Sequence, residues 1–406
     1  MRTLRKIRFF CKKFSRRLLS KVGKFESLCA DVIYDRSRCT KFATCPLFIF
    51  SKLFEKIVRM RYWLYSKNIF LSQSLGCPVI VVGNLTVGGT GKTPVVEKFA
   101  RELSDKGRKV AILSRGYKSK SEPKLKTFFR WITHARELPP RVVSNGKKVL
   151  LGSEFAGDEP YMLARNLPGV IVIVGKDRVK AGRYAIEKYG ANILILDDGF
   201  QYLPLRGHMN LLLIDQTNPF GNGKLLPRGI LREPIDHLKR ASYILLTKTD
   251  IGQDNLLESA IRKILPKANL IKCCHKPKYL RSLTDEKDML PIGELNAKAI
   301  CTFSGIAMPD SFEHFLKVQG ANIVYGKRFI DHHRFTKYEL DHMYNAAHRH
   351  GADFVVTTEK DAVRMPKDYT YPIQTYFLKV EIDIVEGEKV LDEAIMKFIS
   401  RSKRTS

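Results

Sequence analysis

A glycine-rich segment at residues 86–93 has the residue types that bind the phosphates of a nucleotide. It reads TVGGTGKT and follows the apolar run VIVVG at 79–83. In such a loop, backbone N–H groups and the next helix N-terminus surround a phosphate, a lysine reaches the terminal phosphate oxygens, and a hydroxyl binds Mg²⁺. The residues expected to do this are Thr86, Gly88, Gly89, Thr90, Gly91, Lys92 and Thr93. Thr86 replaces the usual first glycine, but the flanking strand and helix signals favour a nucleotide site over a chance glycine-rich turn.

A metal ion at this loop needs a carboxylate at the end of a neighbouring strand. The segment ILILDDGFQ supplies Asp197 and Asp198 at such a point, and Gly199 then ends the strand. One carboxylate would bind Mg²⁺ directly or through water while the other orients it. Adjacent residues of a strand point to opposite faces, so we expect the two aspartates to have different roles. The alternative is a pair of surface acids at a turn.

A candidate general base lies in the segment AGDEPYM at 156–162. Asp158 follows a glycine and stands ahead of a proline, a pattern typical of a loop or the start of a helix. A carboxylate there can accept the proton of an acceptor hydroxyl. It can equally cap a helix by accepting from backbone N–H groups, and the spacing alone favours neither role.

Histidines and arginines elsewhere in the chain are candidates to complete such a site. The segment RFIDHHRF places His332 and His333 beside an aspartate. Either histidine can assist a base or bind phosphate, and an exposed histidine pair is the alternative. The segments SRGY at 114–117 and LLPRGILREP at 225–234 place arginines near predicted strand ends, where arginine suits the charge of a transferring phosphoryl group. Each arginine taken singly is more often a solvated surface group.

A parallel sheet is needed to bring these segments together. Short, continuously apolar runs separated by helical patterns are typical of strands buried on both faces. They occur at 79–83, 110–114, 169–175, 193–198, 211–215 and 243–247. We therefore predict an α/β fold in which residues 72–250 form a phosphate-loop α/β/α domain with a parallel sheet. Residues 251–406 are more mixed but keep strand and helix patterns, which predicts a second, smaller α/β domain.

The charge of the 406-residue chain predicts a polyanionic partner. Its formal net charge is +30, and residues 1–70 hold 18 Lys/Arg against 4 Asp/Glu. Such a balance fits nucleic acid, an anionic membrane surface or a phosphorylated substrate. The eight cysteines contain no CxxC pair. They indicate reduced thiols of a cytosolic protein rather than a disulfide or zinc framework.

Residues 46–71 are predicted to form an amphipathic helix with Pro46 in its first turn. A polar stripe at i, i+3, i+4 and i+7 consists of Lys52, Glu55, Lys56 and Arg59. The remaining surface is Leu, Ile, Phe, Trp and Tyr, which either packs on the core or lies in a membrane interface. The basic residues before the helix favour the membrane.

The sequence has no signal for a spanning helix, which needs roughly 20 uninterrupted apolar residues. It also lacks the apolar segment and small-residue cleavage site of a secretory signal. An arginine-rich, acid-poor start leaves an organelle transit peptide as a minority alternative.

Seven segments in a fixed order resemble the tetraacyldisaccharide 4'-kinase family. They are GNLTVGGTGKTP, SRGY, AGDEP, ILDDGFQ, LLPRGILREP, FIDHH and TTEKDAVRM. Together with the helix they span about residues 46–365, and a threonine at the first loop position is itself typical of this family. The resemblance implies two α/β/α domains that close over the substrate. It also implies transfer of the γ-phosphate of Mg-ATP to the 4'-hydroxyl of tetraacyldisaccharide 1-phosphate, giving lipid IVA for lipid A.

The resemblance also implies roles for single residues. Asp158 would be the base and His332 its partner, with His333 the less favoured register, and domain closure would bring the partner histidine to the base. The remaining site residues implied are Lys92 and Arg232 for charge stabilisation, Asp197 and Asp198 for Mg²⁺, and Tyr117 near the substrate. The helix would hold the enzyme peripherally on the cytoplasmic face of the bacterial inner membrane. Residues 1–45 would then be an additional basic extension.

Two other functions are compatible with parts of the sequence. The segment TKTD at 247–250 resembles the guanine-reading motif of GTPases, which makes a regulatory or metal-insertion GTPase the second candidate. A titration with GTP against ATP would separate the two. A nucleic-acid-dependent ATPase would account for the charge, but nothing in residues 251–406 resembles a nucleic-acid module, so we expect no nucleic-acid partner.

Overall fold

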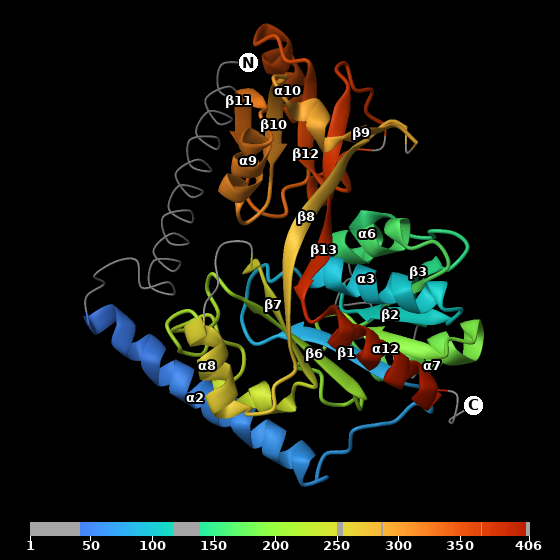
Figure 1. Cartoon of the computed structure of the whole chain (residues 1–406), viewed down its shortest axis with the longest axis vertical. Coiled ribbons are helices and arrows are strands. Elements are labelled where there is room, and N and C mark those ends of the chain that lie inside the picture. Colours follow the sequence, from blue (N-terminus) through green and yellow to red (C-terminus); the bar gives the residue numbers. More distant parts are fainter. Residues whose placement is uncertain (1–40, 117–138, 250–254, 286, 367, 403–406) are drawn as a thin grey trace, which may run out of the picture. The chain divides into compact units, whose positions relative to one another are not determined.

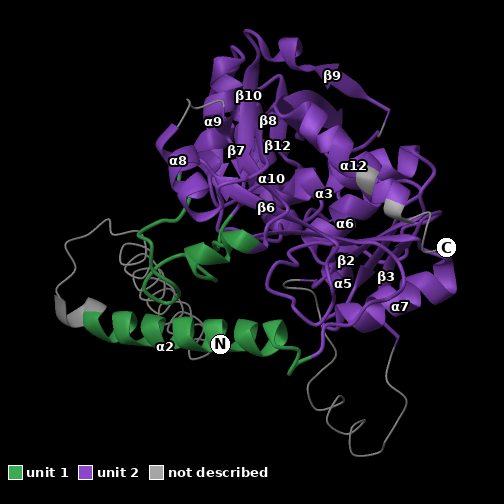
Figure 2. Ribbon diagram, turned by 60° about the horizontal axis from the view of Figure 1, so that its bottom comes forward, with its two compact units in different colours: residues 1–70, 85–88, 218–239 green, residues 71–84, 89–217, 240–406 purple. Residues whose placement is uncertain are grey.

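The computed structural model describes residues 41–116, 139–249, 255–285, 287–366 and 368–402 (Figure 1). It divides into two compact units (Figure 2). The first comprises residues 1–70, 85–88 and 218–239, and the second comprises residues 71–84, 89–217 and 240–406. Residues 1–40 of the predicted extension, Tyr117, and Asp250 of the TKTD segment lie outside the described residues.

Thirteen strands of the described residues form one sheet in the second unit. The strands are β1 (Val79–Asn84), β2 (Val110–Ser114), β3 (Arg141–Asn145), β4 (Ile171–Val174), β5 (Ile193–Leu196), β6 (Met209–Asp215), β7 (Tyr243–Thr247), β8 (Leu270–Ser282), β9 (Met289–Pro291), β10 (Ala299–Ser304), β11 (Asn322–Arg328), β12 (Phe354–Thr358) and β13 (Thr375–Glu386). Their order is β11-β10-β12-β13-β8-β7-β6-β1-β5-β2-β4-β3, with β9 paired to β8. Strand pairs are parallel except β3–β4, β8–β13 and β8–β9. All six predicted strands are present, and the α/β fold class is confirmed.

Helices cover both faces of this sheet, which explains why its strands are apolar throughout. The helices of the unit are α3 (Lys92–Asp105), α5 (Ser153–Ala156), α6 (Asp158–Asn166), α7 (Arg178–Tyr189), α8 (Asn255–Ile264), α9 (Pro309–Val318), α10 (Lys337–Arg349), α11 (Glu359–Ala362) and α12 (Glu388–Ser402). Ile80 and Val82 pack with apolar residues of α3, α6 and α12, whereas Val79 and Val81 pack with α7. Alternate residues of one strand therefore contribute to two cores.

The long antiparallel pair β8–β13 joins two groups of strands within this sheet (Figure 1). On one side β8 pairs with β7, and on the other β13 pairs with β12. The strands beyond β13 have separate apolar clusters with α9 and with α10. Strands from before and after the predicted domain boundary at 250/251 therefore belong to the same sheet. The division into two α/β domains stays a prediction.

The first unit contains α2 (Lys41–Ser66), which begins five residues before the predicted Pro46 (Figure 2). Residues 41–45 contain no glycine or proline, so the helix continues upstream and Pro46 removes only one N–H donor from it. The polar stripe is bound within the unit. Glu55 pairs with Lys52 at 3.0 Å, and Arg59 pairs with Asp236 at 2.7 Å. The polar side of α2 is thus the side that contacts the 218–239 segment.

Candidate active site

The phosphate loop connects β1 to the N-terminus of α3. Gly91, immediately before α3, has φ 78°, and Gly88 has φ 117°, both in the region that favours glycine. A side chain at Gly91 would also collide with the imidazole of His275 in β8. The positive φ therefore favours glycine directly before Lys92, and a larger residue would also have to displace the His275 side chain. The loop leads into the N-terminal N–H groups of α3, an arrangement that binds phosphate.

The Lys92 ammonium group lies between the end of β1 and the end of β5. Its Nζ is 3.3 Å from Asn84 Oδ1 and 3.5 Å from Asp198 Oδ1. Strands β1 and β5 are parallel neighbours, so the segments that follow them lie at the same edge of the sheet. The structure therefore brings the loop lysine and the aspartate pair together, as the sequence predicts.

Asp197 and Asp198 have different surroundings. Asp197 is buried, and its Oδ2 accepts a hydrogen bond from Ser114 Oγ at 3.0 Å. Its Oδ1 is buried without a hydrogen-bond partner among the described residues, as is Thr90 Oγ1. Burial raises the pKa of Asp197 to about 7, and the negative charges of Glu159 and Asp198 add to this effect. Asp198 is half-buried, has φ 52° and faces Lys92.

These residues fit a bound divalent cation. A buried carboxylate oxygen without a partner is costly unless a cation or donor satisfies it. The described residues contain no group of three or more His, Cys, Asp or Glu that could hold a metal ion by itself. At nucleotide sites Mg²⁺ is generally held by phosphates and water, with one or two protein ligands. Asp197 and the Thr93 hydroxyl are the residues that would supply them.

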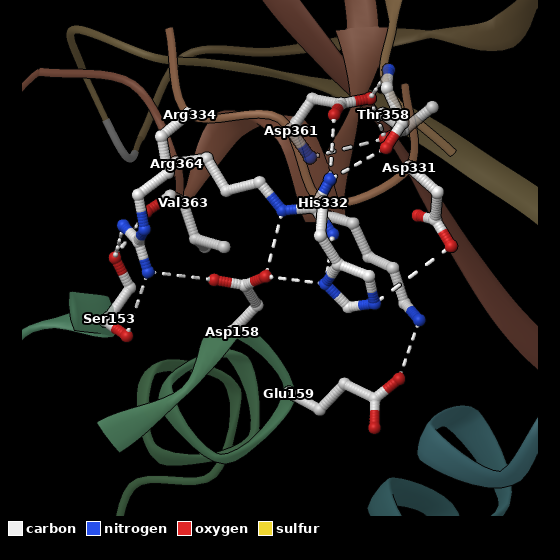
Figure 3. Close-up of polar contacts among 12 residues, drawn as sticks. Ser153, Asp158, Glu159, Asp331, His332, Arg334, Thr358, Asp361, Val363 and Arg364 are labelled. Carbon is white, nitrogen blue, oxygen red and sulfur yellow. Dashed lines mark hydrogen bonds and ion pairs between the residues drawn. The ribbon is translucent and has the colours of Figure 1, made fainter. Parts of the chain in front are cut away.

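Asp158 is the first residue of α6 and is surrounded by one histidine and two arginines (Figure 3). Its Oδ2 lies 3.0 Å from His332 Nδ1 and 2.8 Å from Arg364 Nε, and its Oδ1 lies 3.2 Å from Arg334 Nη2. The N-cap of α6 is Gly157, and no side-chain cap hydrogen bond is formed. The carboxylate of Asp158 thus binds side chains rather than capping its helix.

The structure separates the two candidate histidines. His332, with φ 66°, contacts Asp158, and its backbone N–H donates to Gly305 O at 3.1 Å. His333 instead lies 3.1 Å from Glu339 Oε2 and stacks on Phe329. His332 is therefore the histidine beside the candidate base. The structure brings this pair together, and the expectation that domain closure does so stays a prediction.

Two arginines at this site were not singled out from the sequence. Arg364 has no exposed side-chain surface, and its Nη1 donates to Gly305 O at 2.7 Å and to Asp361 Oδ1 at 3.1 Å. Arg334 is 39% exposed and also donates to the carbonyl of Ser153 at 3.1 Å. The sequence places the first in TTEKDAVRM and the second directly after the histidines. A buried acid requires such partners, but nothing in the sequence indicates which arginines supply them.

The side chains of His332, Arg364 and Arg334 keep the carboxyl group of Asp158 ionised. Burial by itself would raise the pKa of its carboxyl, but His332, Arg364 and Arg334 hold that pKa below its usual range. The neighbouring Glu159 binds Lys360, with 2.6 Å between Oε1 and Nζ. Although burial opposes it, Lys360 and Lys92 hold the pKa of Glu159 below its usual range as well. Glu159, the residue next to the candidate base, is thus stabilised by Lys92 of the phosphate loop and in turn helps to raise the pKa of Asp197.

The other predicted residues lie in different surroundings. Arg232 belongs to the first unit, where its backbone N–H donates to Leu85 O at 2.6 Å. In that unit Thr86 forms a β-bridge with Leu231. The described part of the TKTD segment ends β7, where Thr247 Oγ1 donates to the carbonyl of Thr90 at 3.3 Å. This segment therefore contacts the backbone of the phosphate loop through a hydrogen bond.

Known proteins resemble the chain along most of its length. Residues 43–400 match a family model described as tetraacyldisaccharide-1-P 4'-kinase. A tetraacyldisaccharide 4'-kinase of Halothermothrix orenii is 34% identical over 393 residues, which cover 92% of this chain and 98% of that protein. One of Anaeromyxobacter dehalogenans is 37% identical over 360 residues, covering 87% and 90%. A crystal structure of "apo" form LpxK from Aquifex aeolicus in complex with ATP is 31% identical, with a TM-score of 0.69, covering 89% of this chain and 99% of that one.

Proposed function

The chain belongs to the tetraacyldisaccharide-1-P 4'-kinase family, and on that premise we propose how its residues carry out phosphoryl transfer. The protein is a kinase that uses ATP and Mg²⁺ to phosphorylate the 4'-hydroxyl of tetraacyldisaccharide 1-phosphate in lipid A biosynthesis. The family match favours this activity over a GTPase or a nucleic-acid-dependent ATPase. The contact between Asp158 and His332 carries the mechanistic proposal.

The phosphate loop and the aspartate pair form the nucleotide half of the site. When bound, Mg-ATP supplies the γ-phosphoryl group and a cation that neutralises part of its charge. The loop N–H groups and Lys92 would hold the phosphates, and Asp197 and Thr93 would hold the cation. Asp198 keeps the Lys92 ammonium group directed to this edge of the sheet. We retain Arg232 as a further charge-stabilising residue and Tyr117 as a substrate contact, both on the resemblance of their segments.

Asp158 and His332 form the acceptor half, with Asp158 as the base. Its carboxylate is already charged when the hydroxyl arrives, because the two arginines and the histidine stabilise the ionised form. His332 Nδ1 also lies 3.2 Å from Arg364 Nη2. When Nδ1 carries the imidazole proton, it donates to Asp158 Oδ2 and orients the carboxylate, and Asp158 takes the proton of the acceptor hydroxyl. Phosphoryl transfer needs little more than such late proton removal and alignment.

The apolar side of α2 supports attachment to a membrane surface. Its exposed large apolar side chains include Ile49, Phe50, Leu53, Met60 and Trp63. Because the polar stripe is paired within the first unit, the helix presents its apolar side outward, the reverse of an ordinary surface helix. We place this helix in the interface of an anionic membrane, where the acylated substrate resides, on the cytoplasmic face of the bacterial inner membrane. No helix of the described residues is long and apolar enough to cross a membrane.

The proposal is tested by transfer of label from [γ-³²P]ATP to tetraacyldisaccharide 1-phosphate in detergent. Wild type, Asp158→Ala and His333→Ala are compared, since His333 is the adjacent histidine that does not contact Asp158. We expect labelled lipid from wild type and His333→Ala and almost none from Asp158→Ala, with ATP binding retained in all three. Wild-type activity in Asp158→Ala would remove the base assignment.

A further inference from the structure

A buried lysine outside the charged site binds the helices that carry its residues. Lys379 of β13 is 4% exposed, and its Nζ lies 3.1 and 3.0 Å from the two carboxylate oxygens of Glu97. The same Nζ lies 3.2 Å from both carboxylate oxygens of Glu359. Glu97 is in α3, which begins with Lys92, and Glu359 begins α11, which precedes Arg364. One ammonium group therefore binds a carboxylate from each of the two helices α3 and α11.

The last residue of α6 brings a third helix into the same cluster. Asn166 Nδ2 donates to Glu97 Oε2 at 3.1 Å and to Glu359 Oε1 at 2.6 Å. Because α6 begins with Asp158, this amide fixes the far end of the helix that presents the candidate base. Arg101 closes the cluster by donating to Glu97 Oε1 at 2.8 Å and to the carbonyl of Asn166 at 3.0 Å.

The ammonium group of Lys379 offsets the repulsion between the buried carboxylates of Glu97 and Glu359. Burial raises the pKa of the Glu359 carboxyl, and the nearby Glu97 raises it further. Both carboxylates in turn raise the pKa of the Lys379 ammonium group, although burial opposes this. Without the lysine, only Arg101 at Glu97 and the neutral amide of Asn166 would offset the repulsion between the two buried carboxylates, and Glu359 would lose its ammonium partner.

We propose that Lys379 is a positioning residue that holds the phosphate-loop helix α3 in register with α6 and α11, and so aligns Lys92 with Asp158 and Arg364. The inference rests on the proposed roles of Lys92 and Asp158. Lys379 touches none of the reacting groups; it acts through the helices that carry them. Transfer between two bound substrates is sensitive to such alignment, because a misplacement of about 1 Å can cost on the order of a hundredfold in rate.

Two variants separate positioning from stability. Lys379→Met removes the cation, whereas Lys379→Met/Glu359→Gln also removes one carboxylate and so relieves the repulsion. Lys276→Met is the matched control, because Lys276 lies on the adjacent strand β8 in an exposed ion pair with Asp383 at 3.1 Å. Thermal midpoint, number of ATP-binding sites, kcat, and KM for ATP and for the lipid are measured for each protein at a temperature where all are folded.

We expect Lys379→Met to lower both the thermal midpoint and kcat, the latter by about tenfold or more, with both KM values within about threefold of wild type. In the double variant the thermal midpoint should recover while kcat stays low, because the ammonium group that binds both α3 and α11 is still missing. Recovery of kcat together with the midpoint, or unchanged kcat in Lys379→Met, would overturn the proposal. Asp158→Ala in the same assay tests the base assignment separately, whatever the lysine variants show.

Discussion

His332 Nδ1 lies 3.0 Å from Asp158 Oδ2, although the two residues are 174 positions apart in the chain. The contact joins the first residue of α6 to the segment after β11, and each side chain is held by further partners. Arg364 contacts both, with Nε on the carboxylate and Nη2 near the imidazole. The carboxylate and the imidazole are therefore expected to act as one unit in proton transfer.

Removal of either member of this pair should cost nearly as much activity as removal of both. We expect Asp158→Asn and His332→Ala each to lower kcat by roughly 10²–10⁴-fold, the usual contribution of a general base. The double variant should lose little more, since groups that act as a unit are not additive. A double-mutant cycle on kcat provides the measurement, with His333→Ala as the control. Additive losses would contradict joint action of the carboxylate and the imidazole.

The ion pairs of Asp158 predict a pH-dependent stability difference. Its pKa is lowered in the folded protein, so its contribution is present above the unfolded pKa of about 3.9 and is lost as pH falls through the lower folded pKa. We expect Asp158→Asn to be less stable than wild type by roughly 2–3 kcal/mol at pH 7. Urea denaturation should show this gap unchanged down to about pH 5 and shrinking below about pH 4. A gap that widens on acidification would contradict the assignment of charge.

Much of the fold follows from local sequence, whereas the surroundings of the base do not. Strands such as β2 and β7 are short apolar runs bounded by polar residues, and their limits match the prediction. The phosphate loop is local as well. Arg334 and Arg364, by contrast, are 176 and 206 residues from Asp158. Their role depends on sheet order and on the long β8–β13 pair, which no local pattern encodes. The same holds for Lys379, which the sequence shows only as one of several charged residues within β13.

The two arginines at Asp158 should differ sharply in their effect on stability. Arg364→Met removes a buried guanidinium from the fully buried Asp361 and from Asp158, which keeps only the more exposed Arg334 and His332, and we expect a loss of about 3–5 kcal/mol. Arg334 is 39% exposed, so Arg334→Met should cost less than about 1 kcal/mol. Chemical denaturation of both variants in the same buffer compares them directly. Equal losses of unfolding free energy in the two variants would show that exposure does not determine how much each ion pair stabilises the protein.

Asp197→Asn should stabilise the protein without nucleotide while impairing its activity. The raised pKa means that the folded state opposes ionisation, so wild type loses stability as pH rises from about 4 to about 7. The amide carries no such cost, and the variant should be more stable at pH 8 by on the order of 1–3 kcal/mol, with the gap closing near pH 4. Thermal unfolding without Mg²⁺ measures this. Mg²⁺-dependent ATP binding, measured alongside, should weaken, and unchanged binding would exclude Asp197 as the cation ligand.

Charge placed on the apolar side of α2 should release the enzyme from membranes without inactivating it. Leu53 is 53% exposed, and Leu53→Glu puts a carboxylate where acyl chains would lie. We expect co-sedimentation with vesicles containing phosphatidylglycerol to fall by about tenfold or more, since lost apolar burial and repulsion by anionic lipid act together. Glu55→Gln is the matched control, because Glu55 lies on the paired polar stripe of the same helix and should stay bound. The kcat for detergent-dispersed substrate should remain near wild type in both variants. Undiminished sedimentation of Leu53→Glu would show that the exposed side of α2 contacts something other than lipid.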